Sequence, residues 1–226
     1  MRTSTKKTDQ PQPRDLYRTR AYDELRSRFS RNEYAPGAYL SERQLAAELG
    51  MSKTPIKAAL ARLEMEGFID VSPQTGIFVR DLTDKEIADL YEIRIALEGY
   101  ALRTIAGNLS DSQLKVWETN VNALAKCTGT PRSRRKAVAL DTEFHLLPMQ
   151  FLGNQQIVDT MQQYSERIQI VIHRVFALLP DRISQSVEEH REILQAVRKG
   201  EGAKASILVE AHLKLGHKML IEARLQ

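Results

Sequence analysis

Four residues in the later part of the chain have side chains that could bind a divalent metal: Asp141, His145, His190 and His212. Asp141 and His145 are four positions apart, so both project from one face of a predicted helix. His190 and His212 each lie on the apolar face of a later predicted helix. Three imidazoles and one carboxylate would therefore face one interior, and this donor set suits zinc, nickel or another borderline divalent cation.

A single inward-facing histidine is more often a hydrogen-bonded core residue than a metal ligand. The convergence of four donors from three helices favours the metal site, with coordination positions left open for water or a ligand. The apolar stripe that carries His190 consists of Ile193, Leu194 and Val197. The stripe that carries His212 consists of Leu208, Leu215 and Met219. His173 and His217 do not lie clearly on the shared face, so the predicted site excludes them.

Arg94 is a candidate anchor for a negatively charged ligand. It lies in line with apolar residues of its predicted helix, so its guanidinium is directed toward an apolar face. The planar fork of arginine binds a carboxylate through two parallel hydrogen bonds. The alternative is an internal ion pair with Glu98, one helical turn further on, and the sequence does not decide between the two.

A second group of residues could bind DNA. Lys53, Thr54 and Lys57 occupy the exposed face at the start of a predicted helix, where a helix-turn-helix protein presents its base-reading side chains. The predicted DNA contacts are Arg43, Ser52, Lys53, Thr54, Lys57, Thr75 and Gly76. Gly76 lies at the tip of a predicted hairpin and would allow it to approach the minor groove.

The elements that position these DNA contacts follow one another between residues 41 and 80. Ser41 and Gln44 have the spacing of a capping box, which predicts a helix start, and Gly50 predicts its end. Ser52 caps the next helix, and Pro55 lies in its first turn. Two short alternating runs, 69–71 and 77–79, predict a β-hairpin. Together they predict a winged helix-turn-helix domain over residues 15–80.

Residues 81–226 show no strand pattern and predict an all-α bundle. Capping motifs at Thr83, Ser110 and Ser186 and glycines at the predicted ends divide this region into six helices. Their expected ranges are 84–106, 111–127, 132–152, 155–178, 184–199 and 202–224. Pro148 should kink the third of these helices. The fold class is therefore mainly α, with a winged helix-turn-helix domain followed by a six-helix bundle.

Composition supports two domains in a reducing compartment. The chain has 226 residues, a net charge of +4 and one cysteine. The positive surplus lies wholly before residue 81, which suits contact with phosphates. Residues 1–14 are polar and basic and predict a disordered tail. Neither a membrane span nor a signal sequence is evident, so we expect a cytoplasmic protein.

The predicted winged helix-turn-helix domain resembles the DNA-binding domain of the GntR family of bacterial transcription regulators. The residues that carry this resemblance are Pro36-Gly37, Leu40 to Ala46, Leu49 to Lys57, Ala59-Leu60, Leu63, Glu66-Gly67 and Gly76. The match is long and ungapped. This chain has Lys53 and Lys57 where family members commonly carry arginine, so the consensus operator of the family should not be assumed for it.

The second domain resembles the FCD effector domain of the FadR subfamily of GntR regulators. The matching segments are Tyr91 to Arg94 with Leu97-Glu98, Asp141 to His145, Glu189 to Leu194 and Ala211 to Leu213. The resemblance implies that Asp141, His145, His190 and His212 are metal ligands and that small organic acids are effectors. Six helices rather than seven indicate the shorter, VanR-like branch.

These features predict a ligand-responsive transcription regulator, not an enzyme. We expect a homodimer on a palindromic double-stranded operator, because a symmetric dimer lets one reading head address both half-sites. Two alternatives remain open at this point: a metal-dependent enzyme with a regulatory DNA-binding head, and a pure metal sensor. No His-Glu-x-x-His motif supports the enzyme. Repressor is the expected role, although the residues do not fix the sign of regulation.

Overall fold

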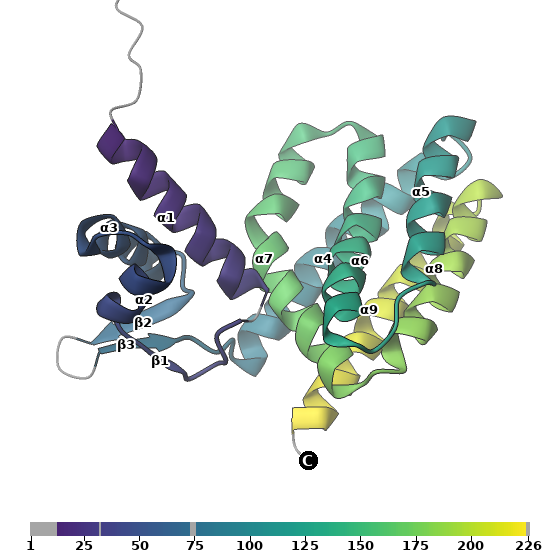
Figure 1. Ribbon diagram of the computed structural model, residues 1–226. Coiled ribbons are helices and arrows are strands. Elements are labelled where there is room, and N and C mark those ends of the chain that lie inside the picture. The colour runs from purple at the N-terminus through teal and green to yellow at the C-terminus, as the bar shows by residue number, and fades with distance from the viewer. Residues whose placement is uncertain (1–12, 32, 73–75, 225–226) are drawn as a thin grey trace, which may run out of the picture. The chain divides into compact units, whose positions relative to one another are not determined.

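The computed structural model describes residues 13–31, 33–72 and 76–224, with the side chains of 13–15 left out (Figure 1). The chain divides into two compact units between Asp81 and Leu82. Within the described residues there are nine helices and three short strands. The predicted tail lies outside the described residues except for Pro13 and Arg14, which belong to the first helix.

The first unit is a winged helix-turn-helix, as predicted. Helices α1 (Pro13–Ser30), α2 (Glu42–Leu49) and α3 (Lys53–Met65) precede a hairpin of β2 (Ile69–Ser72) and β3 (Gly76–Val79). The sequence pattern missed β1 (Tyr39–Leu40), which pairs antiparallel with β3 and gives the sheet order β1-β3-β2. Buried side chains of α1, including Leu25 and Phe29, contribute to the core of this unit.

The helices of the first unit have fewer side-chain capping hydrogen bonds than predicted. The Ser41 hydroxyl accepts a hydrogen bond from the Gln44 amide at 3.1 Å, but the Gln44 side chain donates to Glu48 instead of completing the capping box. Ser52 occupies the N-cap position of α3, yet its side chain makes no capping hydrogen bond. The amides in the first turn of α3 are therefore left without a side-chain cap. Gly50 ends α2 with a left-handed φ of 63°, as expected.

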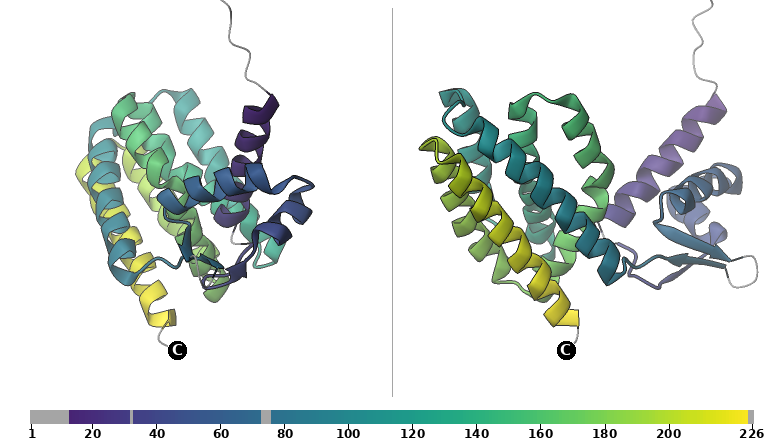
Figure 2. Two further views of the ribbon diagram at one scale, coloured as in Figure 1. Left: turned by 90° about the vertical axis from the view of Figure 1, so that its left-hand side faces the viewer. Right: turned by 180° about the vertical axis from the view of Figure 1, so that it is seen from behind.

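The second unit consists of six helices over the described residues 82–224, which confirms the all-α prediction. They are α4 (Asp84–Ile105), α5 (Asp111–Leu124), α6 (Pro131–Leu152), α7 (Gln155–Leu178), α8 (Arg182–Arg198) and α9 (Gly202–Arg224). Helices α4 and α9 run side by side, as the view from behind in Figure 2 shows. None of the described helices is long and apolar enough to cross a membrane.

Two predicted helix starts are confirmed in detail and one is wrong. Thr83 and Ser110 each form a complete capping box at the start of α4 and α5. The predicted start of α8 at Ser186 is incorrect, because α8 begins at Arg182 and Ser186 lies buried inside it. Pro148 is likewise buried inside α6, which continues to Leu152.

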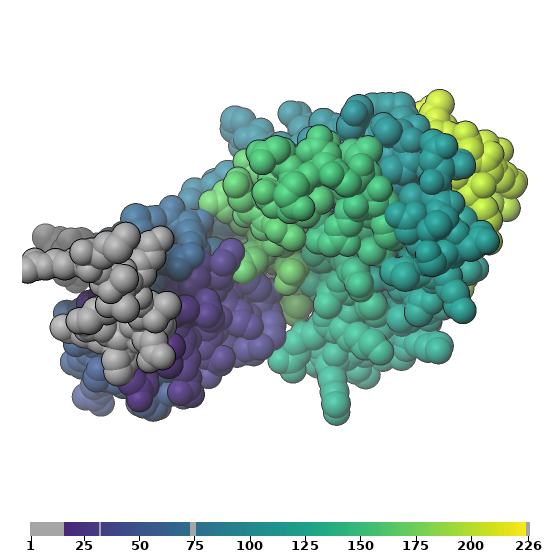
Figure 3. Space-filling view, turned by 90° about the horizontal axis from the view of Figure 1, so that it is seen from above, coloured from purple at the N-terminus to yellow at the C-terminus, as the bar shows by residue number. Residues whose placement is uncertain are grey.

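The buried face of α9 differs from the predicted stripe. Leu215 is 41% exposed, while Leu213 and Leu220 are buried. His212 is nevertheless on the buried face, because the helical period brings Val209, His212, Leu213 and Gly216 to the same side. On the face seen in Figure 3, side chains of α5, α6 and α7 cover the interior of the second unit.

Candidate metal centre and nucleic-acid interface

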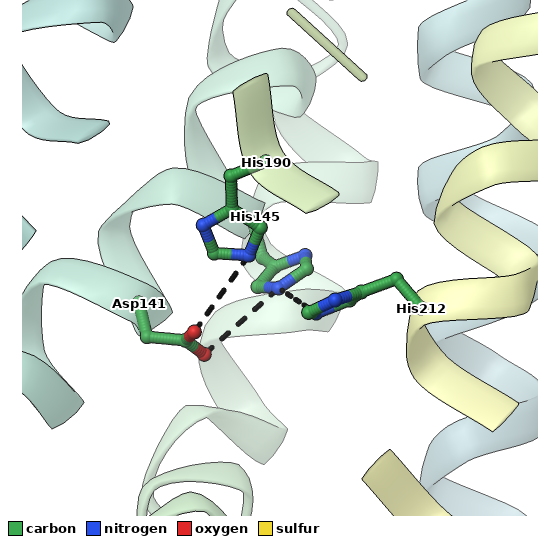
Figure 4. A group of neighbouring side chains, drawn as sticks. All are labelled: Asp141, His145, His190 and His212. Atoms are coloured by element: carbon green, nitrogen blue, oxygen red, sulfur yellow. Dashed lines mark hydrogen bonds and ion pairs between the residues drawn. The ribbon is translucent and has the colours of Figure 1, made fainter. Parts of the chain in front are cut away.

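The four predicted ligands meet inside the second unit. Asp141 and His145 project from α6, His190 from α8 and His212 from α9, and all four point toward one another (Figure 4). One donor atom from each lies within 4.8 Å of the others. None of the four is more than 7% exposed. The structure thus brings together every residue of the predicted set, whereas His173 and His217 lie outside it.

Two of the imidazoles are hydrogen-bonded to carboxylates through Nδ1. Nδ1 of His145 lies 2.6 Å from Oε2 of Glu98, and Nδ1 of His212 contacts Oε2 of Glu189. A carboxylate accepts a hydrogen bond, so in a neutral ring Nδ1 carries the proton and Nε2 presents a lone pair. The two Nε2 atoms lie 3.2 Å apart. Two lone pairs facing each other at that distance repel unless a cation lies between them.

His190 has no hydrogen-bond partner for either ring nitrogen among the described residues. Its ring stacks on Phe144 at a centroid distance of 3.6 Å, which fixes the ring plane. Its Nε2 lies 3.7 Å from Oδ1 of Asp141. A buried polar atom without a partner costs about 1–3 kcal/mol. The orphaned nitrogens therefore indicate a missing partner, and a metal ion suits the position.

Electrostatics keep these imidazoles available as ligands. Burial, followed by the charges of His212 and His145, lowers the pKa of His190 well below its ordinary value. Burial also lowers the pKa of His145 and His212, although Glu98 and Glu189, respectively, oppose the shift. Neutral imidazole is the form that binds metals. With metal–nitrogen bonds of about 2.0–2.1 Å, two adjacent imidazole ligands are separated by roughly 3.0–3.4 Å, and the 3.2 Å spacing matches this.

Two arginines hold the carboxylates that orient the imidazoles. Nε of Arg94 donates to Oε1 of Glu98 at 2.8 Å, and Arg182 binds Glu189 through both Nη atoms at 2.7 and 2.6 Å. Burial acts to raise the pKa of Glu98, but its interactions with His145 and Arg94 outweigh burial and hold the pKa at about 2. Sequence reasoning missed the role of Arg182, because that residue precedes the predicted start of α8.

Arg94 forms the internal ion pair that the sequence offered as the alternative to ligand binding. Even so, its Nη2 atom is buried and has no partner among the described residues. Arg94 also lines an internal cavity of about 20 Å³, together with Asp141, Arg182 and His212. That volume holds about one water molecule. The pair with Glu98 therefore leaves one donor of Arg94 free beside the ligand cluster.

The predicted DNA contacts that the structure describes lie on the surface of the first unit. Arg43, Ser52, Lys53, Thr54 and Lys57 are all exposed. A surface hollow of about 440 Å³ adjoins the start of α3, and Tyr17 and Arg18 of α1 line it together with Ser52 and Thr54. Tyr17 and Arg18 were not among the predicted DNA contacts. Thr75 lies outside the described residues.

Gly76 has a structural role at the start of β3. Its φ of 101° is one that other residues rarely adopt, and a Cβ atom there would lie 2.4 Å from the ring of Tyr39. The ring of Tyr39 packs against Phe78 on the neighbouring strand. Glycine is thus required at this position by the close approach of Tyr39.

A winged helix-turn-helix unit joined to a helical unit with a buried ligand cluster defines a two-part DNA-binding regulator. Residues 17–79 match the family described as bacterial regulatory proteins, gntR family, and residues 89–215 match the FCD domain. The chain belongs to the GntR family and carries an FCD domain. It is a DNA-binding transcription regulator with an FCD effector domain.

Relatives agree with this assignment. The Nta operon transcriptional regulator of Aminobacter aminovorans is 31% identical over 189 residues, covering 84% of this chain and 87% of the relative. The HTH-type transcriptional repressor RspR of Escherichia coli is 26% identical over 183 residues, covering 80% and 78%. A putative GntR regulator from Rhodococcus has the same fold, with a TM-score of 0.76, 20% identity and coverage of 92% and 98%.

Proposed function

We propose that this chain is a metal-loaded, acid-responsive repressor of the FadR subfamily, in its VanR-like branch. Residues 15–80 would bind DNA, and residues 81–226 would bind the effector and form the dimer. Six helices in the second unit support the branch assignment, and the repressor named among the relatives supports the sign of regulation. The protein would act on DNA in the cytoplasm.

Asp141, His145, His190 and His212 would hold one divalent cation, zinc or nickel. The observation that carries this proposal is the pair of opposed Nε2 atoms of His145 and His212, each on a ring anchored by a carboxylate. The orphaned nitrogens of His190 support it independently. A bound cation would act as a Lewis acid toward the carboxylate oxygens of an effector.

Arg94 would anchor the carboxylate of a small organic acid. Its free Nη2 atom and its place on the cavity beside Asp141 and His212 support this role. The effector must prefer one arrangement of the regulator if it is to change DNA affinity, and linkage then requires that operator binding change effector affinity by the same factor. The direct connection between the units at Asp81-Leu82 supports such coupling.

The start of α3 would contact DNA through Ser52, Lys53, Thr54 and Lys57, with Arg43 beside them on α2 and Thr75 and Gly76 at the wing. These residues would address each half of a palindromic operator in a homodimer. The exposed side chains and the absence of a side-chain cap on α3 support the proposal. Uncapped amides at a helix start are ready donors to a phosphate.

A DNA-binding titration would test this function. The operator would first be selected from a pool of random duplexes by the full-length protein. Its affinity would then be measured with chelated protein, with zinc or nickel added, and with metal plus carboxylic acids. We expect metal to be required for the acid to change operator affinity. If no acid changes the operator affinity of the metal-loaded protein, the proposal that the regulator responds to an organic acid is contradicted.

The small cavity favours a second candidate, a regulator that senses the metal alone. A space of about 20 Å³ beside the ligands holds a water molecule more readily than an organic acid. In that case, the same titration would show the full change in operator affinity on adding metal, and acids would add nothing.

A further inference from the structure

His190 is held in place differently from the other two imidazoles of the ligand cluster. His145 and His212 each bond a carboxylate through Nδ1, whereas His190 has no hydrogen-bond partner for either ring nitrogen among the described residues. A metal ion would take only one of these two nitrogens. Metal-bound histidines usually donate the other ring N–H to an acceptor, and that hydrogen bond fixes the orientation of the ring. The orientation of His190 must therefore be fixed by some other contact.

The contact that orients His190 is a stack with Phe144, the residue directly before His145 on α6. The two ring planes are 5° apart and their centroids are 3.6 Å apart. Both side chains are buried, and the ring of Phe144 also packs against the buried Trp117 of α5 at a centroid distance of 5.2 Å. In a close-packed interior neither ring can tilt without opening a void. The stack thus sets the direction in which Nε2 of His190 points, 3.7 Å from Oδ1 of Asp141.

The geometry of this stack suits a metal-bound imidazole better than a free one. With nearly parallel planes and centroids only 3.6 Å apart, the two rings lie almost directly over each other. Two electron-rich rings avoid this arrangement and prefer an offset or edge-to-face geometry. A cation bound to His190 would draw electron density out of the imidazole, and the face of an aromatic ring attracts an electron-poor or positively charged group. The face of Phe144 would therefore stabilise the metal-bound form of His190.

We propose that Phe144 is a positioning residue of the metal centre: its ring orients His190, and its electron-rich face raises the affinity for the metal. This inference rests on the proposed metal site and adds to it a residue that supplies no ligand atom. A cation held against an aromatic face gains an interaction equivalent to about 3- to 30-fold in affinity. Since the stack favours the metal-bound ring, weakening the stack should weaken metal binding by a factor in that range.

Fluorination of Phe144 in the full-length protein tests the role of the ring face. The analogue 3,5-difluorophenylalanine nearly keeps the shape of the ring but draws electron density from its face. We expect zinc binding, measured by competition with a chromogenic chelator, to weaken at least about threefold when this analogue replaces Phe144. The matched control is the same replacement at Phe151, whose ring packs against Trp117, and this variant should bind zinc like the wild type. Equal zinc affinities in the two fluorinated proteins would overturn the inference.

Removal of the ring tests the positioning of His190. In the cobalt-loaded protein, the visible absorption spectrum depends on which ligands bind the metal. Phe144→Leu should shift this spectrum toward that of His190→Ala, because the imidazole loses its support, whereas Phe151→Leu should keep the wild-type spectrum. An unchanged cobalt spectrum in Phe144→Leu would also overturn the inference.

The metal site and the role of Phe144 fail in different ways. If the wild-type protein binds neither zinc nor cobalt, the metal site itself is wrong. If the wild-type protein binds zinc and changes at Phe144 have no effect, the metal site stands and only the role of Phe144 is lost. Should Phe144→Leu fail to fold, the fluorinated protein, which keeps the ring, still decides the inference.

Discussion

The Nε2 atoms of His145 and His212 lie 3.2 Å apart in the second unit, although each ring is already bonded to a carboxylate through Nδ1. Both carboxylates are held in turn by arginines, so neither ring can turn away without breaking a buried hydrogen bond. The relationship is therefore built into the packing of four helices. A shared cation would stabilise such an arrangement.

Removing metal should lower the melting temperature. A metal present at a hundredfold over its dissociation constant adds about 2.7 kcal/mol when only the folded state binds it. For a chain of this size that corresponds to a loss of roughly 5–10 °C on chelation. Thermal unfolding with and without chelator measures the melting temperature, and elemental analysis measures the metal content. His190→Ala is the control, because its melting temperature should not respond to zinc. A wild-type protein that holds no metal and shows no shift would refute the metal site.

Glu189→Gln should weaken zinc binding by about 10- to 100-fold, because residues that orient metal-bound histidines usually contribute that much. Zinc affinity measured by competition with a chromogenic chelator gives the value. The matched control is Glu210→Gln on α9, since Glu210 pairs with Lys214 at the surface. Equal zinc affinities in the two variants would show that Glu189 has no part in holding His212.

Lys57→Ala should weaken operator binding and reduce the slope of log affinity against log salt by about one unit if the lysine contacts a phosphate. The structure predicts little loss of stability, because Lys57 is exposed and, among the described residues, pairs only with Glu42, at 3.7 Å on the surface. Anisotropy titrations over a range of potassium chloride provide both values. Lys85→Ala in the second unit is the control. Full affinity in both Lys53→Ala and Lys57→Ala would exclude α3 as the reading helix.

Metal-free protein should lose stability as pH falls from about 7.5 to 5. His190 has a folded pKa well below its ordinary value of 6.5, so below pH 6.5 the unfolded chain takes up a proton that the folded chain does not. Each such histidine costs at most about 1.4 kcal/mol per pH unit. Burial raises the pKa of Asp141 and gives an effect of opposite sign at lower pH.

The change in the free energy of unfolding with pH is measured by chemical denaturation of chelated protein at several pH values. His190→Gln should make this change smaller. A midpoint that stays constant between pH 7.5 and 5 in wild-type protein would show that these histidines are not held neutral by burial.

Local signals in the sequence predicted local structure well. Thr83 and Ser110 form the expected capping boxes because a cap depends only on residues within one turn. The pairing of Asp141 with His145 was predictable for the same reason: the helical period alone places both on one face of α6. The start of α8 was missed because its N-cap, Asp181, makes no side-chain capping bond. Ser186 and Glu189 have the spacing of a capping box but lie inside the helix.

Features that depend on distant contacts could not be predicted. The bond between Arg182 and Glu189 lies within α8, but its extension to His212 requires the packing of α8 against α9. Strand β1 has two residues and no period of its own, so only its pairing with β3 defines it. The reason for glycine at position 76 is equally non-local, since it comes from the ring of Tyr39.

The four ligands lie on α6, α8 and α9, and His145 and His212 are 67 positions apart. A cation bound there would join three helices at one point, so their amides should exchange with solvent as one cooperative unit. Helix α4 supplies no ligand, yet it carries Arg94 and begins two residues after the boundary between the units. Helix α4, which continues directly from the DNA-binding unit, also carries Glu98, the residue that holds His145, so its amides should gain protection from exchange together with the other three when a cation binds.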